Sequence, residues 1–489
     1  MTPSDLVGLL GIVVGLGVLI WLAFKGWSVL LLAPLAAIVA AAFSREPLLA
    51  HWTQTFMRSA AGFFAQFFPL FLLGALFGKL MEDSGSVTAI ADFMIRKLGA
   101  NRVILAVVLG GAIVTYGGVS LFVAFFVIAP MAQDLFLSAS IPRRLMPAAI
   151  MLGTSTFTMS AMPGTPSIQN TIPMPFFGTT PFAAPGLGVL ASVIMLGFGL
   201  WWLQRQEAAA KGRGEGFGEG APRPAETLAA DEILRERATT AREFDPAEIV
   251  HGKAAPAPSF AAAAAPIVVV ILVNLVLSLL VLPRLDLGFL AKPEWGGTSA
   301  SAVTGVWSVM TALTCAILTV LAINFRRIPN LRATIDAGAN ASVLPAISVA
   351  SLVGFGAVVA AMPAFSVVRE GVLGIGGGPL VSLAVATNTL AALTGSASGG
   401  LTIALDALGA TYLAQAAQIG MDPAILHRVA VIGSGTLDSL PHNGAVVTLL
   451  SVCGSTHTDS YKDIFMVGIL GAIIALVVVI VLGSLVESF

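Results

Sequence analysis

The stretch Gly153-Thr-Ser-Thr-Phe-Thr-Met-Ser-Ala-Met-Pro-Gly-Thr-Pro-Ser167 interrupts a long apolar run. It holds seven hydroxyl residues within fifteen positions, Pro163 and Pro166 remove backbone donors, and Gly164 permits conformations closed to other residues. A helix that stops here frees carbonyls that can bind a cation, and the next helix start offers amide donors to an anion. Because broken backbone at membrane depth must be buried in protein or line a wet cavity, this stretch predicts a binding site.

The composition around this stretch is that of a membrane protein. The 489 residues are 57% hydrophobic and 10% charged, whereas soluble domains carry about 25% charged residues. Apolar runs recur from Leu6 to Val486, so no soluble catalytic domain is left over. The net charge of -1 and the scattered basic residues give no reason to expect nucleic-acid binding. Cys315 and Cys453 support neither a disulfide framework nor a cysteine metal site. We expect a polytopic protein of a bacterial inner membrane.

The length of each uninterrupted apolar run distinguishes helices that cross the membrane completely from helices that are broken within it. The regions 102–173 and 379–455 contain only shorter runs, which are typical of re-entrant or discontinuous segments. Their interruptions lie at Tyr116-Gly117-Gly118, at 160–164, at 395–400 and at 438–444. Full-length spans are predicted near 6–24, 27–43, 59–81, 185–204, 262–282, 300–323, 341–363 and 465–486.

An internal repeat relates the two broken regions. Ala149-Ile-Met-Leu-Gly-Thr-Ser-Thr156 aligns with Val429-Ala-Val-Ile-Gly-Ser-Gly-Thr436 at an offset of 280, and Pro142 falls near Pro423. The pattern predicts a first repeat over 1–205, with a hairpin at about 102–135 and a broken helix at about 142–173. A second repeat covers 260–489, with a hairpin at about 379–418 and a broken helix at about 423–455. The segment 206–259, rich in Ala, Gly, Pro, Glu and Arg, is predicted to be a mobile cytoplasmic linker.

The distribution of basic residues orients the two halves. With five spans and one hairpin per half, twelve basic residues fall inside and six outside, Arg428 among the latter. Five is odd, so the second half enters the membrane from the opposite side, and both termini are predicted to be periplasmic. The expected fold is therefore an all-α polytopic membrane protein with about ten transmembrane helices, two re-entrant hairpins and inverted-topology repeats.

The second break, Gly433-Ser-Gly-Thr-Leu-Asp-Ser-Leu-Pro-His-Asn-Gly444, adds ionisable residues to the pattern. Asp438 can ligate a cation or accept a proton, and His442 can titrate near neutral pH. Two glycine-rich hairpin tips are expected to meet the breaks near the midplane, whereas His427 is expected at the surface and 457–463 as a solvated connection. The candidate binding residues are Gly117, Gly118, Ser120, Thr154, Ser155, Thr156, Thr158, Ser160, Gly164, Thr165, Ser396, Ser398, Gly399, Gly400, Ser434, Gly435, Thr436, Asp438, Ser439, His442 and Asn443.

The run from Thr156 to Asn170, together with Asp438-Ser-Leu-Pro-His-Asn-Gly444, resembles the gluconate permease (GntP) family of the ion transporter superfamily, in its hydroxybutyrate or citrate-like branch. The resemblance spans nearly the whole chain apart from the linker. It implies a homodimer in which each protomer has a fixed scaffold and a transport domain that moves as an elevator. It also implies that substrate and cation are held between hairpin tips and broken helices.

These features predict a secondary active transporter, a cation-coupled symporter that imports a small carboxylate such as 3-hydroxybutyrate or a gluconate-like hydroxy acid. Proton or sodium is the expected coupling ion, without a cofactor and without a metal beyond sodium. Since no Arg or Lys lies in either broken segment, helix ends and hydroxyls must receive the carboxylate. The alternatives are a citrate or dicarboxylate transporter and a sodium/proton exchanger using Asp438. An intramembrane hydrolase with a serine nucleophile is disfavoured, because no HExxH motif is present and duplication has no catalytic purpose.

Overall fold

The computed structural model describes residues 3–24, 27–99, 102–218, 257–441 and 443–486, and within these ranges every regular element is helical. The all-α fold expected from the sequence is thus confirmed. The longer helices are α1 (Pro3–Phe24), α2 (Val29–Phe43), α4 (Met57–Asp83), α5 (Ser86–Leu98), α6 (Val103–Tyr116), α7 (Leu121–Ser138), α8 (Met146–Thr154), α12 (Pro185–Gly212), α15 (Phe260–Val276), α16 (Ala300–Asn324), α17 (Leu331–Ala341), α18 (Val343–Ala361), α19 (Phe365–Leu373), α20 (Gly378–Thr394), α21 (Ala397–Gln418), α22 (Pro423–Thr436), α23 (Gly444–Val452), α24 (His457–Ile464) and α25 (Gly471–Leu485). Single turns include α3 (Leu48–Ala50), α9 (Phe157–Ser160), α10 (Ile168–Thr171) and α11 (Pro173–Phe177).

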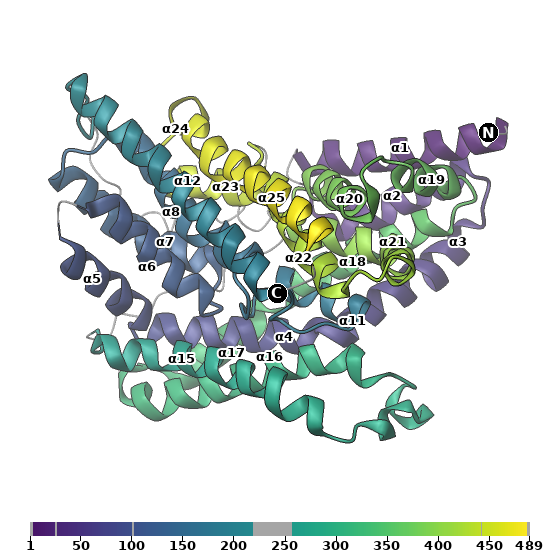
Figure 1. Cartoon of the computed structure of the whole chain (residues 1–489), viewed down its shortest axis with the longest axis horizontal. Coiled ribbons are helices and arrows are strands. Elements are labelled where there is room, and N and C mark those ends of the chain that lie inside the picture. Colours follow the sequence, from purple (N-terminus) through teal and green to yellow (C-terminus); the bar gives the residue numbers. More distant parts are fainter. Residues whose placement is uncertain (1–2, 25–26, 100–101, 219–256, 442, 487–489) are drawn as a thin grey trace.

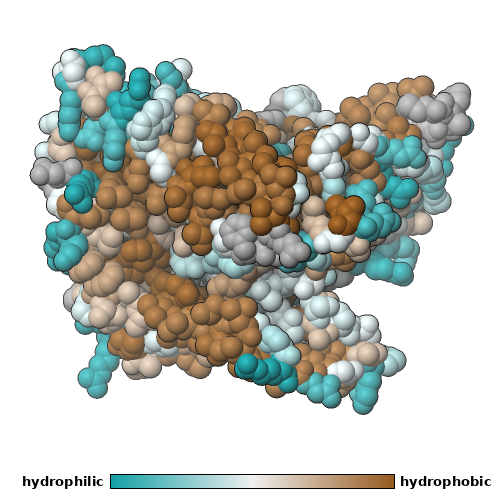
Figure 2. Space-filling view, viewed as in Figure 1, coloured by the Kyte–Doolittle hydropathy of each residue, from teal (hydrophilic) through white to brown (hydrophobic). Residues whose placement is uncertain are grey.

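Seven helical stretches in the described part of the chain are long and apolar enough to cross a membrane. Six of them contain spans expected from the sequence, and the seventh, Leu121–Ser138, is one arm of the hairpin expected to be re-entrant. The first two expected spans are shorter apolar helices, Leu6–Leu22 and Val29–Phe43. Exposed apolar side chains of α12, α25 and α15 form continuous brown areas in Figure 2, as a lipid-facing surface requires. The chain is therefore a polytopic membrane protein.

The helices pack in two groups, which meet mainly where α18 packs against α21, α5 against α15 and α11 against α16. In Figure 1, α4 runs above α15, α16 and α17, while α12 and α25 descend together across the other half of the molecule. In the first group, α4 packs against α16, α17 and α18, and α1 against α2. In the second, α6 packs against α8, α20 against α22, and α12 against α25.

Glycines bring the broken helices close to the hairpins. A Cβ on Gly153 of α8 would lie 2.2 Å from the Val108 carbonyl of α6, and one on Gly433 of α22 would lie 2.4 Å from the Thr387 hydroxyl of α20. Such close approach of backbones is the usual role of small residues between membrane helices. Each broken helix is thereby held directly against a hairpin arm.

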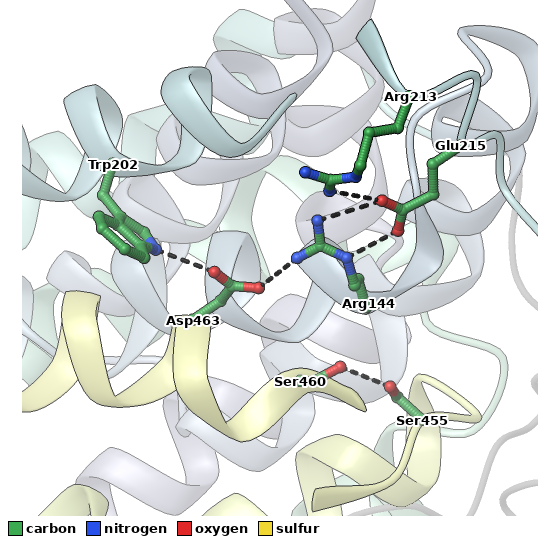
Figure 3. A network of polar contacts seen from close by, with 7 residues as sticks. All are labelled: Arg144, Trp202, Arg213, Glu215, Ser455, Ser460 and Asp463. Carbon is green, nitrogen blue, oxygen red and sulfur yellow. Dashed lines mark hydrogen bonds and ion pairs between the residues drawn. The ribbon is translucent and has the colours of Figure 1, made fainter. Parts of the chain in front are cut away.

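A polar network ties the start of α8 to the ends of α12 and α24 (Figure 3). Asp463, whose side chain is 2% exposed, accepts from Arg144 Nη1 at 2.8 Å and from Trp202 Nε1 at 2.9 Å. Arg144 Nε also donates to Glu215 at 2.7 Å, and Arg213 donates to the same carboxylate at 2.8 Å. These hydrogen bonds, from Arg144 above all, hold the pKa of Glu215 below its ordinary value.

This network bears on two expectations. The segment 457–463 belongs to helix α24: His457, Thr458, Asp459 and Lys462 are exposed, as expected of a solvated connection, whereas Ser460 and Asp463 are buried. The predicted linker does not begin at 206, since α12 continues to Gly212 and the next residues contact the start of α8. Residues 219–256 of that linker lie outside the described residues.

Candidate functional site

The first hairpin tip contacts the first break. The tip between α6 and α7 turns at Gly118, whose φ is +96°, and a Cβ there would lie 2.9 Å from Pro166 Cγ. Such a positive φ favours glycine. The Tyr116 hydroxyl donates to the Pro163 carbonyl at 2.8 Å. The Tyr116 hydrogen bond joins residues that are 47 positions apart in sequence, so the tip and the break are held against one another.

Most hydroxyls of the first break close the turns of their own helices. Thr154 and Thr156 donate to the carbonyls four residues earlier, at 2.8 and 2.7 Å, and Ser160 does so at 3.0 Å. Thr158 donates to Gly153 O at 3.0 Å. These threonines are fully or almost fully buried. They satisfy the carbonyls that the interruption frees, which is one of the common roles of hydroxyls in membrane helices.

The second tip and the second break meet in the same way. Asn443 Nδ2 donates to the Gly395 carbonyl at 2.9 Å and to Asp438 Oδ1 at 2.8 Å, while its Oδ1 accepts from Ala445 N at 2.7 Å. Ser396 caps α21 by accepting from Gly399 N at 3.2 Å. Asn443 thus joins the tip, the break and the start of α23. His442 lies outside the described residues.

Both tips and the first break border one cavity of about 140 Å³. Of the predicted site residues, Gly118, Ser120 and Ser398 line it. Further parts of the lining come from α4 and from the junction of α17 and α18, which are not among the predicted site elements. The remaining lining residues are Leu70, Phe71, Gly74, Ala75, Thr115, Val119, Leu121, Phe122, Met159, Pro166, Ser167, Ile168, Gln169, Ala341, Ser342 and Pro345.

A second cavity of about 20 Å³ adjoins the first. It shares Leu121, Met159 and Gln169 with the larger one, so these three side chains stand between the two spaces. A space of this size holds about one water molecule or one ion. Five predicted residues line it, from both breaks: Ser155, Ser160, Gly435, Asp438 and Ser439.

Gln169 is the residue whose surroundings say most about which ligand the site can bind, and it is not among the predicted binding residues. Its side chain lines both cavities and is 5% exposed, yet its Oε1 has no hydrogen-bond partner. A buried acceptor that no protein group satisfies is open to a donor on a water molecule or on a ligand in the cavity. The available signal was its place two residues after Ser167, in the first turn of the helix that follows the break.

The other predicted residues support these walls rather than line them. They lie in the hairpins and breaks but border neither cavity: Gly117, Thr154, Thr156, Thr158, Gly164, Thr165, Ser396, Gly399, Gly400, Ser434, Thr436 and Asn443. In the described ranges, no group of three or more His, Cys, Asp or Glu residues could hold a metal ion. A cation here would be held by Asp438 together with neutral oxygen atoms.

Two expectations about α22 are wrong. His427 is not at the surface, and Arg428 is not in an outer connecting segment, because both side chains are completely buried. The Ala161 carbonyl of the first break and the Ala183 carbonyl after it accept from Arg428 and so replace the water that its guanidinium would otherwise need.

Comparisons with known proteins agree on the class of protein. Residues 6–197 match the model of the family described as "GntP family permease". The chain is 39% identical over 488 residues to the "Uncharacterized transporter YxjC" of Bacillus subtilis (strain 168), which covers 97% of this chain and 99% of that protein. Among solved structures, the Alcanivorax borkumensis YdaH transporter aligns with a TM-score of 0.56 and 16% identity over 90% of both chains. The likeness to YdaH concerns the fold alone.

Proposed function

The chain belongs to the GntP permease family and is a membrane transporter, and from this premise we propose that it imports a small hydroxy carboxylate by cation-coupled symport. Neither cavity has a Lys, Arg or His among its described lining residues, so the carboxylate is received by helix ends. The 18-residue helix α7 begins at the larger cavity, where Ser120, Leu121 and Phe122 line the wall. Ser120 makes no side-chain capping bond, and the positive end of the α7 dipole borders the larger cavity, where it can attract a carboxylate.

The observation that carries this proposal is the unpartnered Oε1 of Gln169. An acceptor in the cavity wall requires a donor on the ligand, and the hydroxyl of a hydroxy acid is such a donor. Cavity size sets the ligand size, since an engineered cavity of about 150 Å³ holds benzene. A cavity of about 140 Å³ therefore suits a molecule like 3-hydroxybutyrate better than the larger gluconate or citrate.

We assign the smaller cavity to the coupling ion, either a proton or sodium. Asp438 brings the negative charge, and Ser155, Ser160 and Ser439 bring neutral oxygens. Such hard oxygen ligands suit a small cation, and a carboxylate in this position equally suits a proton. Sodium/proton exchange without an organic substrate would use the same aspartate, and it is the competing outcome of the test below.

The proposed architecture is a pair of inverted repeats in a homodimer with an elevator motion, in a bacterial inner membrane with both termini periplasmic. The order of elements supports the repeat: hairpin α6–α7 followed by broken helix α8–α10, then hairpin α20–α21 followed by broken helix α22–α23. The walls of the larger cavity support the motion, because α4 and α18 supply one side while the hairpins and the first break supply the other. A site between two helix groups is the arrangement that such a motion needs.

The test is uptake into proteoliposomes of labelled 3-hydroxybutyrate, gluconate and citrate under separately imposed proton and sodium gradients. Gradient-driven accumulation of 3-hydroxybutyrate, abolished by Asp438→Asn, is expected. Accumulation of citrate instead would replace the substrate class with tricarboxylates. Sodium-dependent proton movement without uptake of any acid would replace symport with exchange.

A further inference from the structure

Arg428 is a completely buried cation beside the candidate site. Its Nε and Nη2 donate to the Ala183 carbonyl at 3.2 and 2.7 Å, and its Nη1 donates to the Ala161 carbonyl at 3.0 Å. Nη1 also lies 3.4 Å from Asn170 Oδ1. The guanidinium is thus solvated by oxygen dipoles of the first break and of the segment following it. Dipoles reduce the cost of burying the charge but do not cancel it.

No described carboxylate forms an ion pair with this guanidinium. In its neighbour His427, one neutral tautomer fits both hydrogen bonds of the ring, to Thr179 and to Asn170. Asn170 Nδ2 donates to the Thr165 and Pro181 carbonyls at 3.0 Å each, so its Oδ1 accepts. The proton of His427 then sits on Nε2, 3.2 Å from that Oδ1, and its Nδ1 accepts from Thr179 at 2.6 Å. The cluster retains the single positive charge of Arg428.

This charge stands directly behind both cavities. Ala161, which accepts from Arg428, follows Ser160 of the smaller cavity, and Asn170 follows Gln169, which lines both. One residue spans about 3.8 Å of chain, so the guanidinium lies about 10 Å from the cavity space. Asp438 is the only carboxylate among the described residues that line the cavities.

We propose that Arg428 is the fixed countercharge of the transport site, which makes the site electrically neutral in two states only: empty, and loaded with both anion and cation. When empty, Arg428 balances Asp438; when loaded, the two residues and the two ligands again sum to zero. A site that holds the carboxylate alone or the cation alone carries a net charge, and moving a net charge through a membrane is costly. The residue therefore enforces coupling without touching either ligand. This inference rests on the proposed symport function.

Charge and hydrogen bonding are separated by two substitutions. Arg428→Gln keeps an amide donor and removes the charge, whereas Arg428→Lys keeps the charge and loses the forked contact with two carbonyls. In proteoliposomes without substrate, we expect Arg428→Gln to exchange coupling cation across the membrane (a leak by exchange), since Asp438 with the cation is then the neutral state that moves, whereas the empty site keeps the charge of Asp438 and does not return. Wild type and Arg428→Lys are expected to show no such leak.

Ligand preference gives a second readout. Competition by 3-hydroxybutyrate is compared with competition by its uncharged amide. At about 10 Å and an effective dielectric constant of about 20, losing the charge weakens anion binding by roughly 10- to 20-fold relative to the amide. Arg428→Lys should retain most of that preference. Equal losses for both ligands in both variants, without cation exchange, would assign Arg428 a purely structural role and overturn the proposal.

A second pair of variants, at Asn170, tests the countercharge if Arg428→Gln does not fold. Asn170→Asp places a carboxylate beside the guanidinium, and Asn170→Ala removes the same donors without adding charge. Cation exchange without substrate and a weakened anion preference are expected in Asn170→Asp and not in Asn170→Ala; the same behaviour in both would contradict the countercharge. Failure of the wild type to accumulate any carboxylate would instead refute the proposed function, so the two failures are distinct.

Discussion

Replacing Gln169 by leucine should stabilise the protein and damage substrate recognition at the same time. No described protein group donates to the buried Gln169 Oε1, and a buried acceptor in such a position costs up to about 1–3 kcal/mol. Leucine has a similar size and no acceptor, so the variant should gain up to about that amount of folding stability. The substrate hydroxyl, in contrast, loses its partner on entering the cavity.

The same energy gives the expected change in ligand preference. A hydroxyl left without a partner costs about 1–3 kcal/mol, which corresponds to roughly 5- to 150-fold in affinity. Wild type should therefore bind 3-hydroxybutyrate more tightly than butyrate by a factor in this range. In Gln169→Leu the preference should disappear, while affinity for butyrate stays the same or rises.

The assay combines competition uptake in proteoliposomes with thermal unfolding in detergent. Met159→Leu is the matched control, because Met159 lines the same two cavities without a hydrogen-bonding group and this swap usually costs less than about 1.5 kcal/mol. The control should keep the hydroxyl preference. A Gln169→Leu protein that is less stable and still prefers 3-hydroxybutyrate would show that the amide has a structural function, and the reasoning would be refuted.

The remaining predictions concern the tip and the polar network. Gly118→Ala should destabilise by about 1–3 kcal/mol in thermal unfolding, because its φ of +96° disfavours a side chain; Gly62→Ala, in an exposed and open helical position, should be neutral or stabilising. Asp463→Asn should lower stability by about 1–3 kcal/mol, since a buried charged hydrogen bond to Arg144 is lost, and unchanged unfolding would contradict this. Glu215 has a lowered pKa, so its contribution is present above its unfolded pKa of about 4.3 and is lost as pH falls through the folded value. The melting temperature of wild type should therefore approach that of Glu215→Gln only in the acid range.

The location of the site was predictable because its causes are local in sequence. Pro163, Gly164 and Pro166 fall within four positions, a density that favours an interruption of the helix, and the repeat showed where the second interruption lies. The structure places five of the expected residues around the smaller cavity and three around the larger one. Which of the clustered hydroxyls face a cavity was not predictable. Thr154 and Ser155 are neighbours of similar chemistry, and only the backbone path decides that one closes a turn while the other lines a wall.

Contacts between residues far apart in sequence explain why Arg428 was placed wrongly and Gln169 was missed. Arg428 lies near the start of an apolar run, as do basic residues that flank the membrane, so counting charges assigned it to an outer connection. Its acceptors are carbonyls 245 and 267 residues away, which no local pattern reveals. Gln169 was missed for the related reason that an unpartnered atom is a property of its surroundings and not of its own sequence.

The burial of Arg428 also bears on where a coupling ion can bind. A helix that stops in the membrane frees carbonyls, and the first break was expected to offer them to a cation. The structure uses the Ala161 carbonyl for the guanidinium instead, and the hydroxyl of Thr156 occupies Leu152 O one turn earlier. Since a fixed positive charge already lies there, a second cation on that side would be repelled. The cation is therefore drawn toward Asp438 of the second break, and the amide end of α7 remains for the anion. On this argument the two breaks are alike in sequence but have opposite electrostatic roles.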